Sequence, residues 1–373
     1  MECGFYLLSG SDTEFSGVNK KIDNQIKVLS KKCKTIRVEI PKKRGNLIES
    51  VAWRLPLGSW GADYDKALSI IEECSNGASV SFFYIRTQFF DRCYISFLRT
   101  LRQNYTAAKI ILEIPTYPYD FEIIKSKTMW PWYFKDHFYR GKVSKYIDRI
   151  ATFTNDYEIF NVPTIRIMNG MDVDSFSLAK CENDNDTIKM IAVAMMQPYH
   201  GFERLIKGLH TYYNNGGSRD VHISFVGYGP ELAYYKKIVE ECKLSERVLF
   251  AGKLSGEALD NAYDGCDIAI GSMGGYKIGI EVFSSIKLGE YLAKGLPVVT
   301  GARTLVFDKY GDDYNLDFPN DSSEIEISKI VDFYDKIYKG KDKRKVREEI
   351  RAFAMQTIDV SITMKDVLDY LEN

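Results

Sequence analysis

The sequence predicts an α/β protein with two doubly wound parallel sheets. Strand-like and helix-like runs alternate along the whole chain, as in parallel sheets joined by crossover helices. The chain has 373 residues, more than one typical core, so two domains of roughly 150 to 200 residues are expected. The alternation starts again after a turn-rich segment at 167–174, which places one sheet in each half.

The elements follow in order along each half. In the first half, strands are predicted at 5–8, 35–40, 79–85, 109–114, 149–153 and 164–167, and helices at 18–32, 63–75, 91–104 and 138–146. In the second half, strands are predicted at 189–194, 222–226, 248–250, 268–270 and 297–300, and helices at 201–214, 231–242, 258–264 and 287–294. One last helix is expected beyond about residue 350.

The composition indicates the class of protein and the cellular compartment. With 45% hydrophobic and 27% charged residues and a formal net charge of -1, the chain should be globular rather than disordered. Its seven scattered cysteines form no Cys-x-x-Cys pair, which argues for a reducing cytosol and against structural zinc. No apolar run approaches the roughly 18 residues that span a bilayer, and no signal-peptide pattern opens the chain. We therefore expect a cytoplasmic protein that is neither secreted nor transmembrane.

The segment that begins at Ser284 carries the strongest functional signal. It predicts a short helix that Ser284 and Ser285 open and a Gly-Leu-Pro sequence closes. Unpaired N–H groups at such a helix start suit an anion, and Lys287 adds a full charge beside them. Glu290 shares a helix face with Lys287, one turn behind, where a carboxylate can accept hydrogen bonds from two ribose hydroxyls. This predicts a nucleotide diphosphate site, with an ordinary amphipathic helix as the alternative.

Other residues of the second half fit the same site. Gly227 and Gly229 follow a strand, where missing side chains let the backbone approach a ligand closely. A dehydrogenase is disfavoured because the third glycine of a dinucleotide fingerprint is absent. His200 and Arg204 could neutralise a leaving diphosphate together with Lys287. For His200, a hydrogen bond to a backbone carbonyl at a helix entry is the alternative.

Acceptor-site candidates follow strands of the first half, because strand carboxyl ends in open α/β sheets face the ligand crevice. They are Tyr117, Tyr119, Asp120 and Glu122, with Arg86 at the end of the neighbouring strand as a group for an anion. A plain turn at the two prolines of this segment is the structural alternative. Gly17, near the start of the first helix, could approach a phosphate or donor sugar, or simply belong to a surface loop.

Two segments suggest contact with a membrane surface. Ten Lys/Arg and only two acids lie between Asn19 and Gly45. Aromatic and cationic residues interleave at 130–140, as they do at membrane interfaces. The alternatives are a solvated helix face for the first segment and a core loop for the second. Peripheral contact with the inner membrane is therefore a hypothesis, and no nucleic-acid partner is expected.

The pattern Ser-x-x-Lys-x-x-Glu-Tyr-Leu-Ala-x-Gly-x-Pro-Val at 284–298 resembles the donor-binding helix of retaining GT-B glycosyltransferases of family four, in the variant of bacterial capsule and exopolysaccharide enzymes. The strings at 200–206 and 113–120 are similar to strings of that variant, and 167–174 is similar to its interdomain linker. The resemblance covers nearly the whole chain.

The resemblance implies a GT-B fold. Its parts would be a Rossmann-like acceptor-binding domain at 1–168, a Rossmann-like nucleotide-sugar-binding domain at 169–350, and a C-terminal helix at 351–373 that packs on the N-terminal domain.

The implied activity is retaining transfer of a hexose from a nucleotide diphosphate sugar, with a UDP-sugar favoured, to a lipid-linked glycan of a bacterial surface polysaccharide. No metal or cofactor is implied, and the nucleotide sugar is a substrate. Lys287 would stabilise the departing diphosphate and Glu290 would bind the ribose. The sugar site would be shaped by Gly274, Gly275, Ser284 and Ser285. Ile286 would belong to the donor-binding residues, and the loop with Lys253 would flank the base.

The chain departs from the family pattern at three places. Where the family presents an arginine and a lysine to the diphosphate, this chain has an apolar residue near Ala194 and His200. Where the family has a glutamate that contacts the donor sugar, this chain has Val282, and Glu281 or the two serines would take over that role. Where the family has a histidine in the first domain, Tyr117 or Asp120 would replace it. Two other functions therefore stay open: a GT-B nucleotide-sugar epimerase and a non-catalytic glycosyltransferase-like partner subunit.

Overall fold

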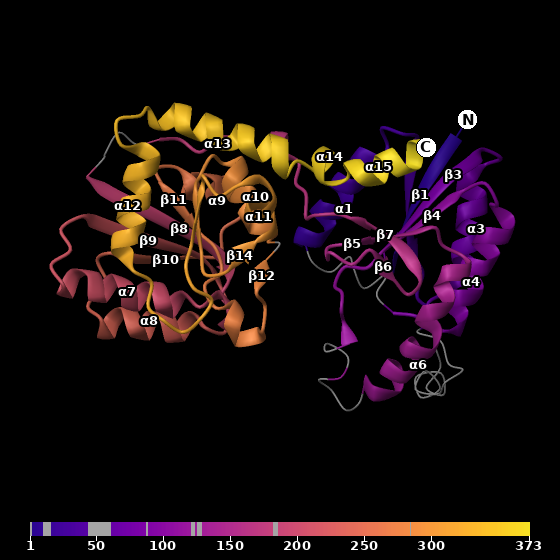
Figure 1. Cartoon of the computed structure of the whole chain (residues 1–373), viewed down its shortest axis with the longest axis horizontal. Coiled ribbons are helices and arrows are strands. Elements are labelled where there is room, and N and C mark those ends of the chain that lie inside the picture. The colour runs from indigo at the N-terminus through magenta and orange to yellow at the C-terminus, as the bar shows by residue number, and fades with distance from the viewer. Residues whose placement is uncertain are drawn as a thin grey trace. The chain divides into compact units, whose positions relative to one another are not determined.

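The computed structural model describes residues 2–9, 16–43, 61–86, 89–120, 124, 129–181, 186–283 and 285–373. It divides into two compact units. Unit 1 consists of Met1–Asn169 and Thr363–Asn373, and unit 2 consists of Gly170–Ile362. Each unit has its own parallel sheet with helices on both faces, as Figure 1 shows. The predicted pair of doubly wound sheets is confirmed.

The sheet of unit 1 has seven strands in the order β2-β1-β3-β4-β5-β7-β6, and only the β6/β7 pair is antiparallel. The strands are β1 (Glu2–Ser9), β2 (Lys34–Ile40), β3 (Ser79–Arg86), β4 (Lys109–Glu113), β5 (Arg149–Thr152), β6 (Glu158–Ile159) and β7 (Val162–Arg166). The helices are α1 (Ser16–Leu29), α3 (Tyr64–Ser75), α4 (Arg92–Asn104), α6 (Trp130–Arg140) and the 3-10 helix η2 (Gly141–Lys145). Because crossovers are right-handed, α1 lies on one face and α3 and α4 lie together on the other (Figure 1).

The sheet of unit 2 has six parallel strands in the order β10-β9-β8-β11-β13-β15, and a separate two-stranded sheet pairs β12 with β14. The strands are β8 (Thr187–Met195), β9 (Asp220–Tyr228), β10 (Val248–Gly252), β11 (Ile268–Ile270), β12 (Val282–Phe283), β13 (Val298–Thr300), β14 (Arg303–Thr304) and β15 (Asn315–Asp317). The chain runs outward from β8 in one direction to β10 and then restarts on the other side at β11. The topological switch point therefore lies between β8 and β11.

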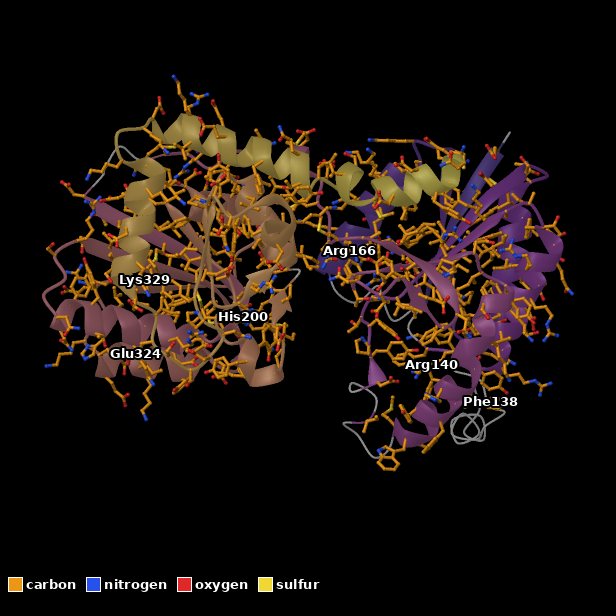
Figure 2. The ribbon with its side chains drawn as sticks, in the orientation of Figure 1. Phe138, Arg140, Arg166, His200, Glu324 and Lys329 are labelled. Atoms are coloured by element: carbon orange, nitrogen blue, oxygen red, sulfur yellow. The ribbon has the colours of Figure 1, made fainter. Side chains whose placement is uncertain are left out.

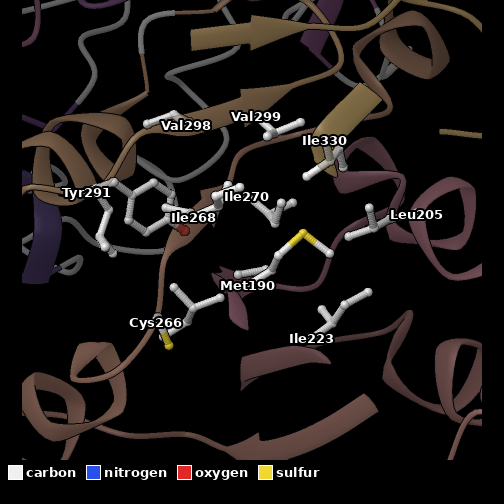
Figure 3. Packing of buried hydrophobic residues seen from close by; sticks show 14 of the residues in the cluster. Met190, Leu205, Ile223, Cys266, Ile268, Ile270, Tyr291, Val298, Val299 and Ile330 are labelled. Carbon is white, nitrogen blue, oxygen red and sulfur yellow. The ribbon is translucent and has the colours of Figure 1, made fainter. Parts of the chain in front are cut away.

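Helices cover both faces of this second sheet, with α7 packed beside α8 and α10 packed beside α13. The α-helices are α7 (Phe202–Asn214), α8 (Leu232–Glu241), α9 (Glu257–Tyr263), α10 (Ile286–Ala293), α11 (Leu305–Tyr310), α12 (Ile327–Tyr338) and α13 (Lys343–Thr357), and the 3-10 helices are η3 (Val173–Ser175), η4 (Pro198–His200) and η5 (Gly275–Ile278). Figure 3 shows part of the core between the layers, to which Met190 and Ile268 of the sheet, Leu205 of α7 and Ile330 of α12 contribute.

The end of the chain differs from the expectation of one last helix. Three helices follow one another: α13, α14 (Val360–Thr363) and α15 (Lys365–Glu372). Helix α13 belongs to unit 2, whereas α15 belongs to unit 1. There, the Lys109 ammonium donates to the Tyr370 carbonyl at 2.7 Å, and Val367 and Leu371 are buried.

The predicted helix at 138–146 was placed too late in the sequence. Helix α6 already begins at Trp130, with Pro131 in its first turn, and only the 3-10 helix η2 follows Arg140. Proline is well tolerated at that position because the first N–H groups of a helix have no partner within the helix. Among the described residues, no helix has both the length and the apolar character that crossing a bilayer requires.

Candidate functional site

A pocket of about 260 Å³ opens at the switch point of the unit 2 sheet. The ends of β8, β9, β11 and β13 form its floor, and the loop after β10 and the start of α10 form its sides. Its lining includes His200, Gly227, Lys253, Ser285 and Lys287. Ligands of open α/β sheets bind at this place, beyond the carboxyl ends of the strands.

The charge of the pocket suits an anion. Lys253 and Lys287 both reach its lining, and the described residues that line it include no Asp or Glu. The ammonium of Lys253 also lies 5.6 Å from the centre of the Tyr228 ring, which lines the pocket as well. The lining thus combines positive charge, which suits phosphates, with aromatic surface, which suits the flat ring of a base.

Helix α10 begins at the pocket as the sequence predicted. The Ser285 side chain caps the helix by accepting a hydrogen bond from the Lys287 N–H at 3.2 Å. Lys287 follows in the first turn, and its ammonium lies 2.6 Å from Oε2 of Glu290. Glu290 is only 8% exposed and is not among the residues that line the pocket. Its other oxygen, Oε1, accepts a hydrogen bond from the buried Tyr263 hydroxyl at 2.8 Å.

His200 lines the pocket as a neutral side chain. The backbone N–H of Gln197 donates to its Nδ1 at 2.9 Å, so the ring proton must sit on Nε2. Burial lowers the pKa of His200 to about 4. At neutral pH the residue can therefore donate one hydrogen bond into the pocket but adds no positive charge.

Arg204 takes a structural place instead of a place in the pocket lining. Its side chain is 2% exposed, and its guanidinium donates to the carbonyls of Met273, Pro319 and Ser323. These bonds join the loop after β11 to the loop after β15. Arg204 therefore supports the wall of the pocket from behind.

The glycines bring backbone segments into close contact. A Cβ on Gly227 would lie 1.9 Å from the Ala194 carbonyl oxygen, and a Cβ on Gly229 would lie 2.5 Å from that of Met196. Gly274 packs on the backbone of Gly201, and Gly275 lies against Phe283 at the start of η5. Of these glycines, only Gly227 is part of the described lining.

Arg86 of unit 1 lies in a buried polar cluster. Its guanidinium pairs with Glu113, whose carboxylate also accepts hydrogen bonds from Lys21, Gln25 and Tyr84 at 2.6 to 3.1 Å. Burial alone would raise the pKa of Glu113, but the two cations and the hydrogen bonds lower it to about 2. The cluster joins α1 to the carboxyl ends of β3 and β4.

The other acceptor candidates gather around α6. The buried Tyr119 hydroxyl donates to Asp136 at 2.9 Å, and Asp120 pairs with Arg140 at 2.6 Å. Burial raises the pKa of Asp136 to about 7, against the effect of its hydrogen bonds. Tyr117 is half-buried, and its ring packs edge-on against Phe160. The structure thus brings Tyr119 and Asp120 together through α6.

The remaining predicted residues are placed as follows. Gly17 belongs to the first turn of α1, and Glu281 is exposed and absent from the pocket lining. Ile286 begins α10 and packs against the core instead of lining the pocket. Ser284 and Glu122 lie outside the described residues, so their predicted roles remain predictions. Among the described residues, no cluster of three or more His, Cys, Asp or Glu side chains could hold a metal ion.

Known proteins share this architecture. Residues 175–332, which lie within unit 2, match the profile of a family described as Glycosyl transferases group 1. A glycosyltransferase from Rickettsia africae superposes with a TM-score of 0.62 at 14% identity, over 99% of this chain and 97% of that one. HepE of Anabaena, solved with UDP, superposes with a TM-score of 0.64 at 13% identity, over 99% of both chains. No curated protein matches the sequence.

The chain has the GT-B fold. Structures of this fold that match it include the lipopolysaccharide outer core galactosyltransferase WaaB, with a TM-score of 0.57 at 11% identity over 100% of this chain and 99% of that one. At 11 to 14% identity these likenesses show the fold, and the family match is confined to residues 175–332.

Sequence reasoning missed one residue that contacts the predicted site residue Glu290, Tyr263. It ends the short helix α9, where an aromatic residue is usually part of the core, and it is indeed fully buried. No local pattern predicts that its hydroxyl reaches Glu290, which follows 27 residues later in the chain. The contact depends on the tertiary structure, which brings the end of α9 to α10.

Proposed function

We propose that this protein is a retaining glycosyltransferase that moves a hexose from a nucleotide diphosphate sugar, with a UDP-sugar favoured. The main support is the pocket at the switch point of unit 2, where Lys253, Lys287 and the amino end of α10 meet without any carboxylate in the described lining. A diphosphate carries the negative charge that this lining would neutralise. The match of residues 175–332 to Glycosyl transferases group 1 and the UDP complex of HepE agree with this choice.

Catalysis would rest on electrostatics and positioning. Lys287 and the positive amino end of α10 would stabilise the charge that develops on the departing diphosphate. His200 contributes a neutral N–H donor, and Ser285 stands next to the sugar site. In a front-face displacement, the leaving diphosphate takes the proton of the acceptor hydroxyl, and no metal is used. Glu281, Tyr117 and Asp120 are the candidates for further contacts with the reacting sugars.

The nucleotide role of α10 can be tested by binding. A thermal-shift screen with UDP, GDP and ADP should show stabilisation by one nucleotide, because a ligand that binds only the folded chain raises its stability. Glu290→Ala should weaken binding of that nucleotide on the order of tenfold, since a lost hydrogen bond to a charged group costs roughly 1.5 to 3 kcal/mol. Glu326→Ala is the matched control, because Glu326 lies on the surface before α12 and bonds only Lys329 among the contacts described.

Three outcomes decide the test. Unchanged affinity in Glu290→Ala would reject the ribose role of Glu290. No stabilisation by any of the nucleotides would reject the donor site. Nucleotide binding without sugar transfer or epimerised product would favour the non-catalytic partner subunit over the enzyme.

The acceptor in this proposal is a lipid-linked glycan of a bacterial surface polysaccharide, and helix α6 of unit 1 supports contact with a membrane. Trp130, Phe134 and Phe138 recur every fourth residue and are 49%, 62% and 65% exposed. The opposite face of α6 buries Lys135 and Asp136. An apolar outer face is unusual for a soluble helix and marks an interaction surface.

We call these three aromatic residues the α6 surface. The positive charge around the α6 surface favours binding to an anionic bilayer. Lys142 lies 3.8 Å from the centre of the Phe138 ring, and Figure 2 labels Phe138 and Arg140 on this helix. In α4, α6 and η2 together, Asp136 is the only acid, and it is buried. Aromatic rings among cations are typical of segments that lie in the headgroup region. The protein would then work in the cytoplasm, in peripheral contact with the inner membrane.

A further inference from the structure

Glu290 is held from two sides by side chains of different character. On the core side, the Tyr263 hydroxyl donates a hydrogen bond of 2.8 Å to Oε1. On the pocket side, the Lys287 ammonium lies 2.6 Å from Oε2. Tyr263 is fully buried, whereas the Lys287 side chain is 41% exposed. The carboxylate is thus held on its inner edge by a buried side chain and covered on its outer edge by a partly exposed lysine.

Tyr263 is itself firmly placed. Its ring packs edge-on against Tyr291 at 6.1 Å, and the Lys294 ammonium lies 5.7 Å from its centre. The Tyr291 hydroxyl in turn accepts from the Val193 N–H at 2.9 Å, so the contacts lead back to strand β8 at the pocket floor. Burial raises the pKa of Tyr263 well above its ordinary value, with neighbouring Tyr291 and the Glu290 carboxylate adding to this effect. The hydroxyl therefore stays protonated and donates.

We propose that Tyr263 is a positioning residue that fixes the Glu290 carboxylate for one task, recognition of the ribose of a nucleoside diphosphate. This inference rests on the proposed function and adds a residue to it. With Oε1 held by Tyr263, Oε2 is the edge offered to a ribose hydroxyl. A hydroxyl that binds there replaces Lys287, whose ammonium then becomes available to the diphosphate in the pocket. Ribose recognition and neutralisation of the phosphates are thereby linked through one carboxylate.

The test compares ribose with deoxyribose. Affinities for UDP and 2′-deoxy-UDP are measured by calorimetry for the wild type and Tyr263→Phe, with the ADP or GDP pair used if that base binds better. The wild type should prefer the ribonucleotide on the order of tenfold, because a missing hydroxyl leaves a charged acceptor without its partner. In Tyr263→Phe this preference should fall to about two- to threefold, since the carboxylate is no longer fixed.

A matched control separates positioning from stability. The buried Tyr338 hydroxyl donates to the Asp267 carbonyl at 3.0 Å, and Tyr338 does not line the pocket. Tyr338→Phe therefore removes a comparable hydrogen bond and should leave the ribose preference unchanged. In addition, Tyr263→Phe should have no effect on the preference in a Glu290→Ala background, because residues that act through one contact are not additive.

The outcomes are distinct. The positioning role is overturned, while the donor site stands, if Tyr263→Phe keeps the wild-type preference for ribose. The same holds if Tyr263→Phe lowers that preference equally in the wild-type and Glu290→Ala backgrounds. If the wild type binds no nucleoside diphosphate, the proposed function itself fails. If it binds one but does not distinguish ribose from deoxyribose, the recognition task assigned to Glu290 is overturned, and the role of Tyr263 with it.

Discussion

Single residues decide how charge is distributed in the pocket. Lys253 and Lys287 are its cations, and His200 is neutral because burial lowers its pKa to about 4 and because its Nδ1 accepts the Gln197 N–H. The sequence placed His200 among the residues that neutralise a diphosphate. The structure instead indicates a hydrogen-bond donor with a fixed tautomer.

This difference predicts a pH dependence of stability. Below the ordinary pKa of about 6.5, His200 binds a proton in the unfolded chain but stays neutral in the folded chain until about pH 4. The free energy of unfolding should therefore fall as the pH decreases from about 6.5 to 4, by on the order of 3 kcal/mol. Urea denaturation of the wild type and His200→Asn at several pH values measures this. The stability difference between them should shrink toward acid, and a constant difference would contradict the prediction.

At the scale of elements, the ends of β8 and β9 determine the shape of the pocket floor. The two strands are in register from Thr187 opposite Asp220 to Met195 opposite Tyr228. Gly227 has φ of 132°, a conformation that side chains with a Cβ rarely adopt, and it lies directly against the Ala194 carbonyl. The close approach of these two strand ends leaves room for a ligand above them.

Gly227→Ala should therefore be costly. Its Cβ would meet backbone rather than a flexible side chain, so we expect a loss of about 3 kcal/mol or more in the free energy of unfolding. Gly216→Ala is the matched control, because Gly216 also has positive φ, 83°, but has open space around it and should lose only about 1 kcal/mol. Chemical denaturation of both variants provides the comparison. Equal losses would mean that backbone strain, not the contact between β8 and β9, determines the cost.

Local sequence signals predicted the helices and strands better than they predicted the contacts between those elements. The start of α10 at Ser285 and the strand after its closing turn could be predicted because a cap and a breaker act on adjacent residues. Helix α6 was missed at Trp130 because a run of aromatic residues beside a proline carries no clear helical period. The pairing of Arg86 with Glu113, and of Tyr263 with Glu290, depends on residues far apart in the sequence. Such pairs arise only from the way the sheet and its helices assemble.

For the whole molecule, a net charge near zero hides local excesses of positive charge. The α6 surface is apolar and bordered by cations, and the exposed lysines of α1 and β2 form a second basic region. Arg37 of that region is partly neutralised by Asp23 and Glu39, and Lys21 is buried against Glu113. Attraction of the cations to anionic lipid and insertion of the aromatic rings should therefore both contribute to membrane binding at the α6 surface.

Flotation with vesicles tests this surface. The protein should bind phosphatidylglycerol vesicles at low salt and bind phosphatidylcholine vesicles weakly, because cations gain most near an anionic surface. Phe134→Ser with Phe138→Ser should reduce partitioning at least about tenfold, since burial of each ring contributes roughly 1.5 to 3 kcal/mol. Tyr157→Ser is the matched control, because Tyr157 is 94% exposed but lies outside α6. Absence of any lipid-dependent flotation at low salt would remove the membrane proposal.

Every wall of the pocket comes from the segment between Gly170 and Ile362. Under the proposed function, the choice of activated sugar could therefore be inherited separately from the choice of the molecule that receives it. Gene exchange that replaces the first half of such a chain could create a new product while the old donor is kept.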